Sequence, residues 1–353
     1  MPPTLEGIIK RVKDGHRVSM DQAAALYAQA EFLDLGALAH GRRLALHPDM
    51  RVTYVVDRNI NYTNVCVSGC RFCAFYKAPG SPDGYVLSRE ELARKIQETI
   101  DVGGTQILLQ GGMNPELHLD YYVNLLRFIK ERFPIHVHGF SPPEIVFMAE
   151  IEGITIREVL IALIDAGLGS IPGGGAEILV DDVRSKVSPR KCTADQWFEV
   201  MHTAHTLRLR TTATMMFGQI ETPEQRLEHL FRVRDLQDET GGFTAFIPWT
   251  FQPRNTQIKV DPLGGVAYLR MLAISRIVLD NVANLQASWV TQGAKIGQIA
   301  LTFGANDLGS TMIEENVVAA AGVRFRLSQQ DMVRLIRDAN FTPAKRDTFY
   351  NLI

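Results

Sequence analysis

The stretch NYTNVCVSGCRFCAFYK, residues 61–77, holds three of the four cysteines of the chain. Cys66, Cys70 and Cys73 follow the spacing C-x3-C-x2-C. Three thiolates on one short loop can bind three irons of a [4Fe–4S] cluster, whereas a self-contained ferredoxin-type site takes four. The fourth iron is then open, and it can chelate the amino and carboxylate groups of S-adenosylmethionine. The spacing therefore predicts a cluster that passes one electron to S-adenosylmethionine and cleaves it.

Two other interpretations of these three cysteines stay open. They could belong to a zinc site with a distant fourth ligand, or they could be unrelated buried thiols. A disulfide framework is disfavoured, because such frameworks spread more cysteines along shorter, secreted chains. Cys192 stands alone before a predicted helix, and we interpret it as a buried free cysteine.

Length and composition indicate a globular protein with a small-molecule ligand. The chain has 353 residues, of which 46% are hydrophobic and 22% charged, enough for one large barrel or two medium domains. A net charge of -2 provides no basic field for nucleic acid. No apolar run reaches the roughly 18 residues of a membrane span. The first residues lack the apolar core of a secretory signal, so we expect a cytoplasmic protein.

Outward from the cysteines, strand, turn and helix alternate at the spacing of βαβ units. This alternation predicts an α/β fold, a closed (β/α)8 barrel with a helical N-terminal extension. We expect a packed extension at 1–50, the core at 51–290, and barrel completion with C-terminal helices at 291–353. The link between the last two strands is short, so we expect only a stub of helix there. The eight strands are expected at 51–57, 105–110, 135–140, 168–173, 211–217, 243–249, 284–290 and 298–304.

Glycine-rich and polar segments follow the expected strands, among them QGG (110–112), GFSPPE (139–144), PGGGAE (172–177) and FGQIE (217–221). Loops after the strands of a barrel form its C-terminal face, where barrel enzymes place their chemistry. Glycines in these loops allow backbone to approach a ligand closely. The pattern therefore predicts that this face carries an active site.

The segment CVSGCRFC resembles the signature of the radical S-adenosylmethionine (radical SAM) superfamily. Over nearly its whole length the chain resembles the cyclic dehypoxanthinyl futalosine synthases of the futalosine route to menaquinone. The segment IPWTFQP (247–253) best distinguishes this family from the aminofutalosine synthases, whose sequences tend to be closer to PLAFHP at this place. The deazaflavin FO synthase subunits, a further set of relatives, tend to lack the glycines of GGGAE. The other resembling stretches are QILLQGG, HGFSPPEI, IPGGGAEIL, ATMMFGQIET, QASWVTQG and GANDLGSTMIEENVV.

The resemblance implies contacts to S-adenosylmethionine near the cysteines. Phe72 would contact the adenine. Gln110, Gly111 and Gly112 stand where the superfamily has its GGE motif, whose backbone meets the methionine ammonium. Gln110 replaces the first glycine and Gly112 replaces the acid, so only the backbone contacts carry over.

Further cofactor contacts are implied after the fourth and fifth strands. Gly218 and Glu221 fit the second half of the adenine motif G-x-I-x-G-x-x-E, although Thr214 and Met216 occupy the earlier Gly and Ile positions. Glu177 is implied to bind the ribose hydroxyls. Its alternative role is a helix N-terminal carboxylate stabilised by the helix dipole.

The resemblance also implies a reaction. A 5′-deoxyadenosyl radical would abstract the ribose C4′ hydrogen of dehypoxanthine futalosine. The carbon radical would add to the benzoate ring, and loss of one electron and one proton would complete the cyclisation. A flavodoxin or ferredoxin would donate the electron that starts the cycle. The alternatives are an aminofutalosine synthase-like enzyme and a non-catalytic Fe–S or zinc-binding protein.

The proton acceptor is expected among His138, Glu144 and Glu177, on loop position alone. We expect His136 and His138 to face opposite sides of the third strand, so that only one enters the lumen. His138 lies nearer the carboxyl end of the strand, which favours it as the active-site histidine. A hydrogen-bonded core histidine is the alternative.

Three residues after the sixth strand are candidates for binding the substrate. Trp249 and Phe251 are expected to share a side near the barrel mouth and to stack on an aromatic ring. Packing in the core is their alternative. Arg254 is expected to hold the benzoate carboxylate, because a guanidinium binds a carboxylate through two parallel hydrogen bonds.

Overall fold

The computed structural model describes residues 4–353. The first barrel strand consists of two halves, β1 (Arg51–Val55) and β2 (Asp57–Asn61). The amino half β1 pairs in parallel with β8 (Asp307–Ser310). The carboxyl half β2 pairs in parallel with β3 (Gln106–Gln110) on the other side. One long strand therefore joins the beginning and the end of the sheet.

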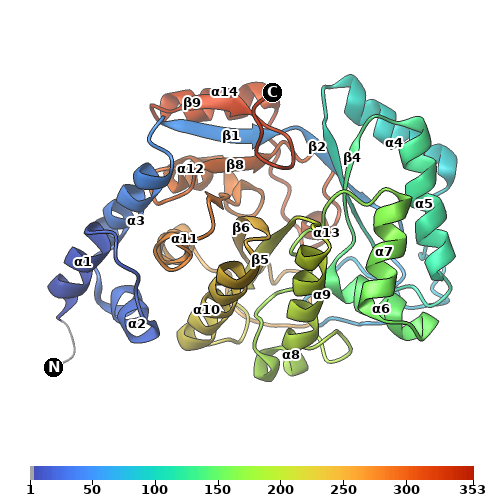
Figure 1. The fold of residues 1–353 in the computed structure, drawn as a ribbon, viewed down its shortest axis with the longest axis horizontal. Helices are drawn as coiled ribbons and strands as arrows, with labels where there is room; N and C mark the ends of the chain where they lie inside the picture. The colour runs from blue at the N-terminus through green and yellow to red at the C-terminus, as the bar shows by residue number, and fades with distance from the viewer. Residues whose placement is uncertain (1–3) are drawn as a thin grey trace.

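The remaining pairs run in parallel around a closed ring (Figure 1). Single bridges at Ser170, Ile171 and Gln286 supply the links that the longer strands leave open. The ring confirms the predicted (β/α)8 barrel. Its order after β3 is β4 (His136–Gly139), residues 170–171, β5 (Thr211–Phe217), β6 (Phe243–Thr250), β7 (Asn284–Leu285) and then β8.

Two expectations about the end of the barrel were wrong. Residues 298–304 are not the eighth strand; they finish helix α12 (Trp289–Ala300) and the turn after it, and the strand is β8. The helix between the last strands is therefore 12 residues long and not a stub. A short apolar run such as QIALTFG is compatible with a strand and with a buried helix end, and periodicity cannot separate them.

Helices cover the outside of the ring, and local signals start several of them. Thr193 and Thr222 form capping boxes with the glutamines three residues later. In α5, Tyr122, Leu126 and Ile129 bury one face of the helix. The helices outside the ring are α4 (Arg89–Asp101), α5 (Leu119–Arg132), α6 (Pro142–Glu152), α7 (Ile156–Ala166), α8 (Asp181–Val187), α9 (Ala194–Thr206), α10 (Pro223–Thr240), α11 (Gly265–Val278), α12 and α14 (Gln329–Asp338). The short helix α13 (Val317–Ala320) follows β8.

Both ends of the chain pack on the barrel. The helices α1 (Leu5–Lys13), α2 (Met20–Gln29) and α3 (Phe32–Leu46) lie at one side, where α2 and α3 contact α11 (Figure 1). The strand β9 (Thr342–Lys345) pairs with β1 at the amino ends of the barrel strands. The division of the chain at residues 50 and 290 stays a prediction. Within 4–353, none of the helices has the length and apolar character needed to cross a membrane.

Candidate active site

A cavity of about 280 Å³ lies inside the barrel. Its wall is built from the strands and the loops after them, and four of the predicted site residues line it: Gln110, His138, Glu177 and Trp249. Arg346, Thr348 and Tyr350 line it as well, and they follow β9 at the amino ends of the strands. The C-terminal segment thus forms the floor of the cavity.

The three clustered cysteines lie on the loop after the first strand. Cys70 is buried and Cys66 and Cys73 are half-buried. The N–H of Met113, next to the QGG segment, points at Sγ of Cys66 from 3.3 Å, and the hydroxyl of Ser68 lies 2.9 Å from Sγ of Cys70. Burial raises the pKa of Cys70 to about 11, and the positive charge of a nearby lysine opposes that rise.

This arrangement is compatible with an iron–sulfur cluster. Among residues 4–353, no three His, Cys, Asp or Glu side chains converge as the ligands of one metal ion do. In a cluster each thiolate binds a different iron, so the three sulfurs need not converge on one point. Cys192 is buried and free, as predicted, with the Arg184 guanidinium beside its sulfur at 3.7 Å.

Close packing explains the two glycines of the QGG segment. A Cβ on Gly112 would lie 2.1 Å from the carbonyl oxygen of Val65, and a Cβ on Gly111 would lie 2.4 Å from the ring of Tyr62. The N–H of Gly112 donates to the carbonyl of Thr63 at 3.1 Å. The segment is therefore held flat against the cysteine loop, which leaves its backbone facing the site without side chains.

Glu144 fastens the same segment and does not line the cavity. Its Oε1 accepts from the hydroxyl of Tyr62 and from the N–H of Gly111, and its Oε2 accepts from the N–H and hydroxyl of Ser141. Burial raises the pKa of Glu144 to about 7. The structure does not support Glu144 as the proton acceptor, because its oxygens are turned into the loops.

Glu177 lines the cavity between two cations. Its Oε1 accepts from Lys191 Nζ at 2.9 Å, and its Oε2 lies 3.4 Å from the Arg184 guanidinium. The ammonium of Lys191 also lies 5.1 Å from the ring centre of Phe72. The alternative role as a helix N-terminal carboxylate was wrong, since α8 begins only at Asp181. Sequence reasoning missed Lys191, which no motif or periodicity marks.

The carboxylate of Glu221 stabilises the loop after β5, to which it belongs. Glu221 accepts from the N–H of Gly218 at 2.5 Å, from the N–H of Gln219 at 2.9 Å and from Arg226 at 2.8 Å. Neither Gly218 nor Glu221 lines the cavity. Glu221 therefore fixes the backbone of this loop, and the contact of Gly218 and Glu221 with adenine stays a prediction.

His136 and His138 share one face of β4, so the expectation of opposite sides was wrong. Side chains alternate along a strand, and residues two apart therefore point the same way. His138 Nδ1 lies 2.6 Å and His136 Nε2 lies 2.7 Å from the hydroxyl oxygen of Ser170. Of the two histidines, His138 lines the cavity, and burial lowers its pKa to about 3.

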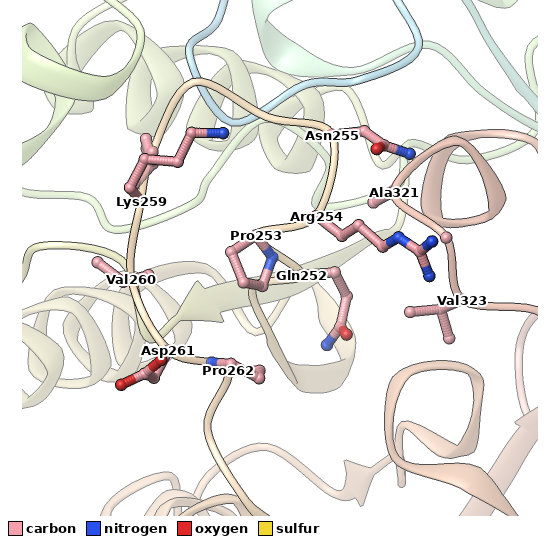
Figure 2. A pocket seen from close by; sticks show the side chains of 12 residues that line it. Gln252, Pro253, Arg254, Asn255, Lys259, Val260, Asp261, Pro262, Ala321 and Val323 are labelled. Carbon is pink, nitrogen blue, oxygen red and sulfur yellow. The ribbon is translucent and has the colours of Figure 1, made fainter.

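The predicted substrate-binding residues separate in space. Trp249 lines the cavity, whereas Phe251 is buried in the core at 2% exposure. Arg254 is exposed in a second groove, shown in Figure 2, with its guanidinium directed toward Ala321 and Val323. Phe251 therefore packs in the core, which was its alternative role. Arg254 lies outside this cavity, and its contact with the benzoate carboxylate stays a prediction. The arginine that lines the cavity is Arg346, which sequence reasoning missed.

Two family models match this chain. The model described as the radical SAM superfamily matches residues 60–233, and the one described as the CofH/MqnC C-terminal region matches residues 240–353. The chain is 51% identical to the cyclic dehypoxanthine futalosine synthase of Halalkalibacterium halodurans, with 99% of this chain and 95% of that one covered. It is 42% identical to the cyclic dehypoxanthine futalosine synthase of Streptomyces coelicolor, with 98% and 88% covered.

A relative with another printed activity is also similar. The 5-amino-6-(D-ribitylamino)uracil–L-tyrosine 4-hydroxyphenyl transferase of Methanopyrus kandleri is 41% identical, with 94% of this chain and 93% of that one covered. Among solved structures, the hydrogenase maturase HydG from Carboxydothermus hydrogenoformans superposes with a TM-score of 0.77 at 16% identity, covering 98% of this chain and 80% of that one. Methylornithine synthase (PylB) superposes with a TM-score of 0.74 at 16% identity, covering 96% and 97%. These two structures confirm the fold.

Proposed function

The chain belongs to the radical SAM superfamily and, within it, to the family of the cyclic dehypoxanthine futalosine synthases, and from this membership we propose how its residues divide the reaction. It is a radical SAM enzyme of the futalosine pathway to menaquinone, and it uses a [4Fe–4S] cluster and S-adenosylmethionine. The observation that carries this conclusion is the 51% identity over 99% of the chain. The reaction is the cyclisation of dehypoxanthine futalosine.

The cofactors are held at the carboxyl ends of the first strands. Cys66, Cys70 and Cys73 bind the cluster, and it supplies, together with S-adenosylmethionine, the one-electron chemistry and the group that abstracts hydrogen. The backbone at Gly111 and Gly112 receives the methionine part of S-adenosylmethionine. This role is supported by the close packing of both glycines on the cysteine loop.

Phe72 and Glu177 bind the adenosine part of S-adenosylmethionine. The ring of Phe72 is fixed under the ammonium of Lys191, which also pairs with Glu177. A cation over an aromatic face restrains both partners. The Glu177 carboxylate lines the cavity, where it can accept hydrogen bonds from ribose hydroxyls. Lys191 is thus a positioning residue that aligns these two contacts.

The substrate occupies the cavity below the cofactors. Trp249 offers its ring as a wall for the benzoate ring, and His138 takes the proton that cyclisation releases. Both side chains line the cavity. A fixed wall holds the reacting carbon in place and excludes water and other hydrogen donors, which a radical reaction requires.

A small acidic flavodoxin or ferredoxin supplies electrons at the outer side of the cysteine loop. Four exposed cations gather there: Arg71, Lys186, Arg190 and Lys259. Arg71 bonds through its guanidinium to the carbonyl of Lys186, and Arg190 bonds to the carbonyl of Ser68. In the described chain none of the four is part of an ion pair. We call these four residues the basic face; their free charge suits an acidic partner.

One incubation tests the assignment. The anaerobically reconstituted, reduced enzyme is mixed with S-adenosylmethionine and, in separate reactions, dehypoxanthine futalosine, the enolpyruvyl substrate of aminofutalosine synthase, or 5-amino-6-(D-ribitylamino)uracil with tyrosine. We expect free 5′-deoxyadenosine and a cyclised product with dehypoxanthine futalosine alone. An adenosyl adduct, or transfer of the tyrosine hydroxyphenyl group, would overturn the assignment in favour of the corresponding relative.

A further inference from the structure

His138, Ser170 and His136 form a hydrogen-bonded chain that runs away from the cavity. His138 lines the cavity, and its Nδ1 lies 2.6 Å from Oγ of Ser170. The same oxygen lies 2.7 Å from Nε2 of His136. Ser170 is 2% exposed and is held by the single bridge that pairs it with His138. A hydroxyl placed between two imidazole nitrogens donates to one and accepts from the other.

The two ends of this chain lie in different electrostatic surroundings. On the cavity side, burial and then the charges of His136 and Arg346 lower the pKa of His138 to about 3. On the far side, burial lowers the pKa of His136 to about 4, and the negative charge of Asp347 opposes that fall. The His136 ring lies against Phe349, which is 42% exposed, at 5.1 Å between ring centres. A positive charge is therefore better tolerated on His136 than on His138.

We propose that Ser170 and His136 position His138 as the proton acceptor of the cyclisation and take over the positive charge that it acquires. This inference rests on the proposed function, which requires a base in the cavity. In the resting state His138 donates its Nδ1 hydrogen to Ser170, and Ser170 donates its hydroxyl hydrogen to Nε2 of His136. Nε2 of His138 then presents its lone pair to the cavity.

The proton transfer balances along this chain. After the C4′ hydrogen atom has been removed and the ring closed, the substrate radical must still lose one electron and one proton. The electron would pass to the oxidised cluster. The C–H electron pair returns to the ring while the proton binds Nε2 of His138. The Nδ1 hydrogen of His138 moves to Ser170, and the Ser170 hydrogen moves to His136. When product leaves, the shifts reverse and His138 releases the proton from Nε2 to water.

A weak base suffices for this step. A ring that has lost an electron after forming a new bond is strongly acidic at the bonded carbon, because losing the proton restores aromaticity. A histidine that stays unprotonated at working pH is always ready to accept, and burial keeps His138 in that form. Three carboxylates also line the cavity, and each already has partners. Glu177 pairs with two cations, and Asp57 accepts from Ser310 and Gln106. Glu315 accepts from three backbone N–H groups at the start of α13.

The chain offers a matched control outside the cavity. His205 lies between two hydroxyls in a similar way, with Nδ1 at 2.6 Å from Thr240 and Nε2 at 2.8 Å from Thr211. Burial lowers its pKa to about 4, but it does not line the cavity. The Thr240→Ala variant therefore removes a hydroxyl from a half-buried histidine without touching the proposed chain.

The experiment compares wild type, Ser170→Ala, His136→Gln and Thr240→Ala as reconstituted holoenzymes. Nitrogen-15 NMR of histidine-labelled protein reports which ring nitrogen of His138 carries hydrogen. We expect Nδ1–H in wild type and His136→Gln, and a mixture of both forms in Ser170→Ala. With dehypoxanthine futalosine, the ratio of 5′-deoxyadenosine to cyclised product is expected to rise about tenfold in Ser170→Ala and His136→Gln, since hydrogen abstraction precedes proton loss. Thr240→Ala is expected to match wild type in both measurements.

The outcomes separate the two levels of the proposal. Hydrogen on Nε2 of His138 in wild type, or an unchanged product ratio in both Ser170→Ala and His136→Gln, overturns the inference while leaving the cyclase assignment standing. Wild type that forms no 5′-deoxyadenosine with dehypoxanthine futalosine overturns the proposed function itself. If Ser170→Ala does not fold, His136→Gln alone decides through the product ratio, because glutamine keeps a partner for Ser170 but cannot carry the proton.

Discussion

The hydroxyl of Tyr62 donates a hydrogen bond of 2.5 Å to the buried carboxyl group of Glu144. This bond joins the loop after the first strand to the start of α6. The same carboxyl oxygen accepts the N–H of Gly111, so one acid ties together the loops that follow the first three strands. These loops include the cysteine loop and the QGG segment. The stability of the site therefore depends on the protonation of Glu144.

Glu144 is expected to make the protein less stable as pH rises. Its pKa is raised from 4.5 to about 7 by burial, so the folded chain keeps a proton that the unfolded chain releases. The free energy of unfolding should fall between pH 4.5 and 7, by up to roughly 3 kcal/mol from this group. In Glu144→Gln that part of the fall should disappear, as measured by urea unfolding at several pH values.

Glu158 is the matched control for that measurement. It forms the same capping box with Thr155, but on the protein surface, and its pKa is lowered by those hydrogen bonds. Glu158→Gln should keep the wild-type fall in stability between pH 4.5 and 7. An equal slope in wild type and Glu144→Gln would show that Glu144 ionises in the folded state as it does in the unfolded chain.

Gly112→Ala is expected to weaken binding of S-adenosylmethionine by at least about tenfold. The added Cβ would lie 2.1 Å from the carbonyl oxygen of Val65, so the QGG backbone must move away from the cysteine loop. Anaerobic calorimetric titration of the reconstituted enzyme measures the affinity. Gly264→Ala is the control, since its Cβ meets nothing within 4 Å. Wild-type affinity in Gly112→Ala would remove this segment from the cofactor site.

Trp249→Leu is expected to raise the KM for dehypoxanthine futalosine about tenfold and to change the melting temperature little. Loss of an aromatic wall costs about 1 kcal/mol of binding beyond the lost area. Phe251→Leu, in the core two residues later, should do the opposite and lower the melting temperature at unchanged KM. Steady-state kinetics with thermal unfolding checks both. Equal KM values for the two variants would place the substrate elsewhere.

Lys186→Glu on the basic face is expected to slow reduction by an acidic flavodoxin severalfold at low ionic strength, and less so at high salt. Reduction by dithionite should be unchanged, because it needs no docked protein. Lys13→Glu on α1 changes the net charge equally and serves as control. Stopped-flow absorbance of the cluster follows both reactions. A similar effect of Lys13→Glu would mean that overall charge, and not this face, governs the encounter.

The sequence predicted those parts of the fold that local spacing controls. Strand and helix alternation predicted the closed barrel, and Cys66, Cys70 and Cys73 lie on the loop expected for them. The prediction of the eighth strand at residues 298–304 was wrong, because an apolar run fits a helix end as well as a strand. The corrected histidine prediction had another cause: applying the two-residue period of a strand correctly places His136 and His138 on one face.

The site was less predictable because its members come from distant segments. Arg346 has no motif around it, and it meets Asp307 only when β9 and β8 come together beside β1. Lys191 is only 14 residues from Glu177, but no motif marks their pairing. Glu144 was singled out by position, but its direction depends on Tyr62, which is 82 residues earlier. The periodicity of one segment predicts toward which face of the element a side chain points. It does not predict which residue of another segment that side chain will contact.

The pairing of β1 has a consequence for how this protein is made. Its amino half is joined on one side by β8 and on the other by β9, both from the final stretch of the chain. During synthesis the first strand therefore emerges long before its partners exist, and loop closures of this length slow folding. The cavity obtains its floor only after Arg346 bonds to Asp307. A cluster acquired before β8 and β9 pair with β1 would lie in an open, water-filled half-barrel, so we expect cluster insertion to follow barrel closure.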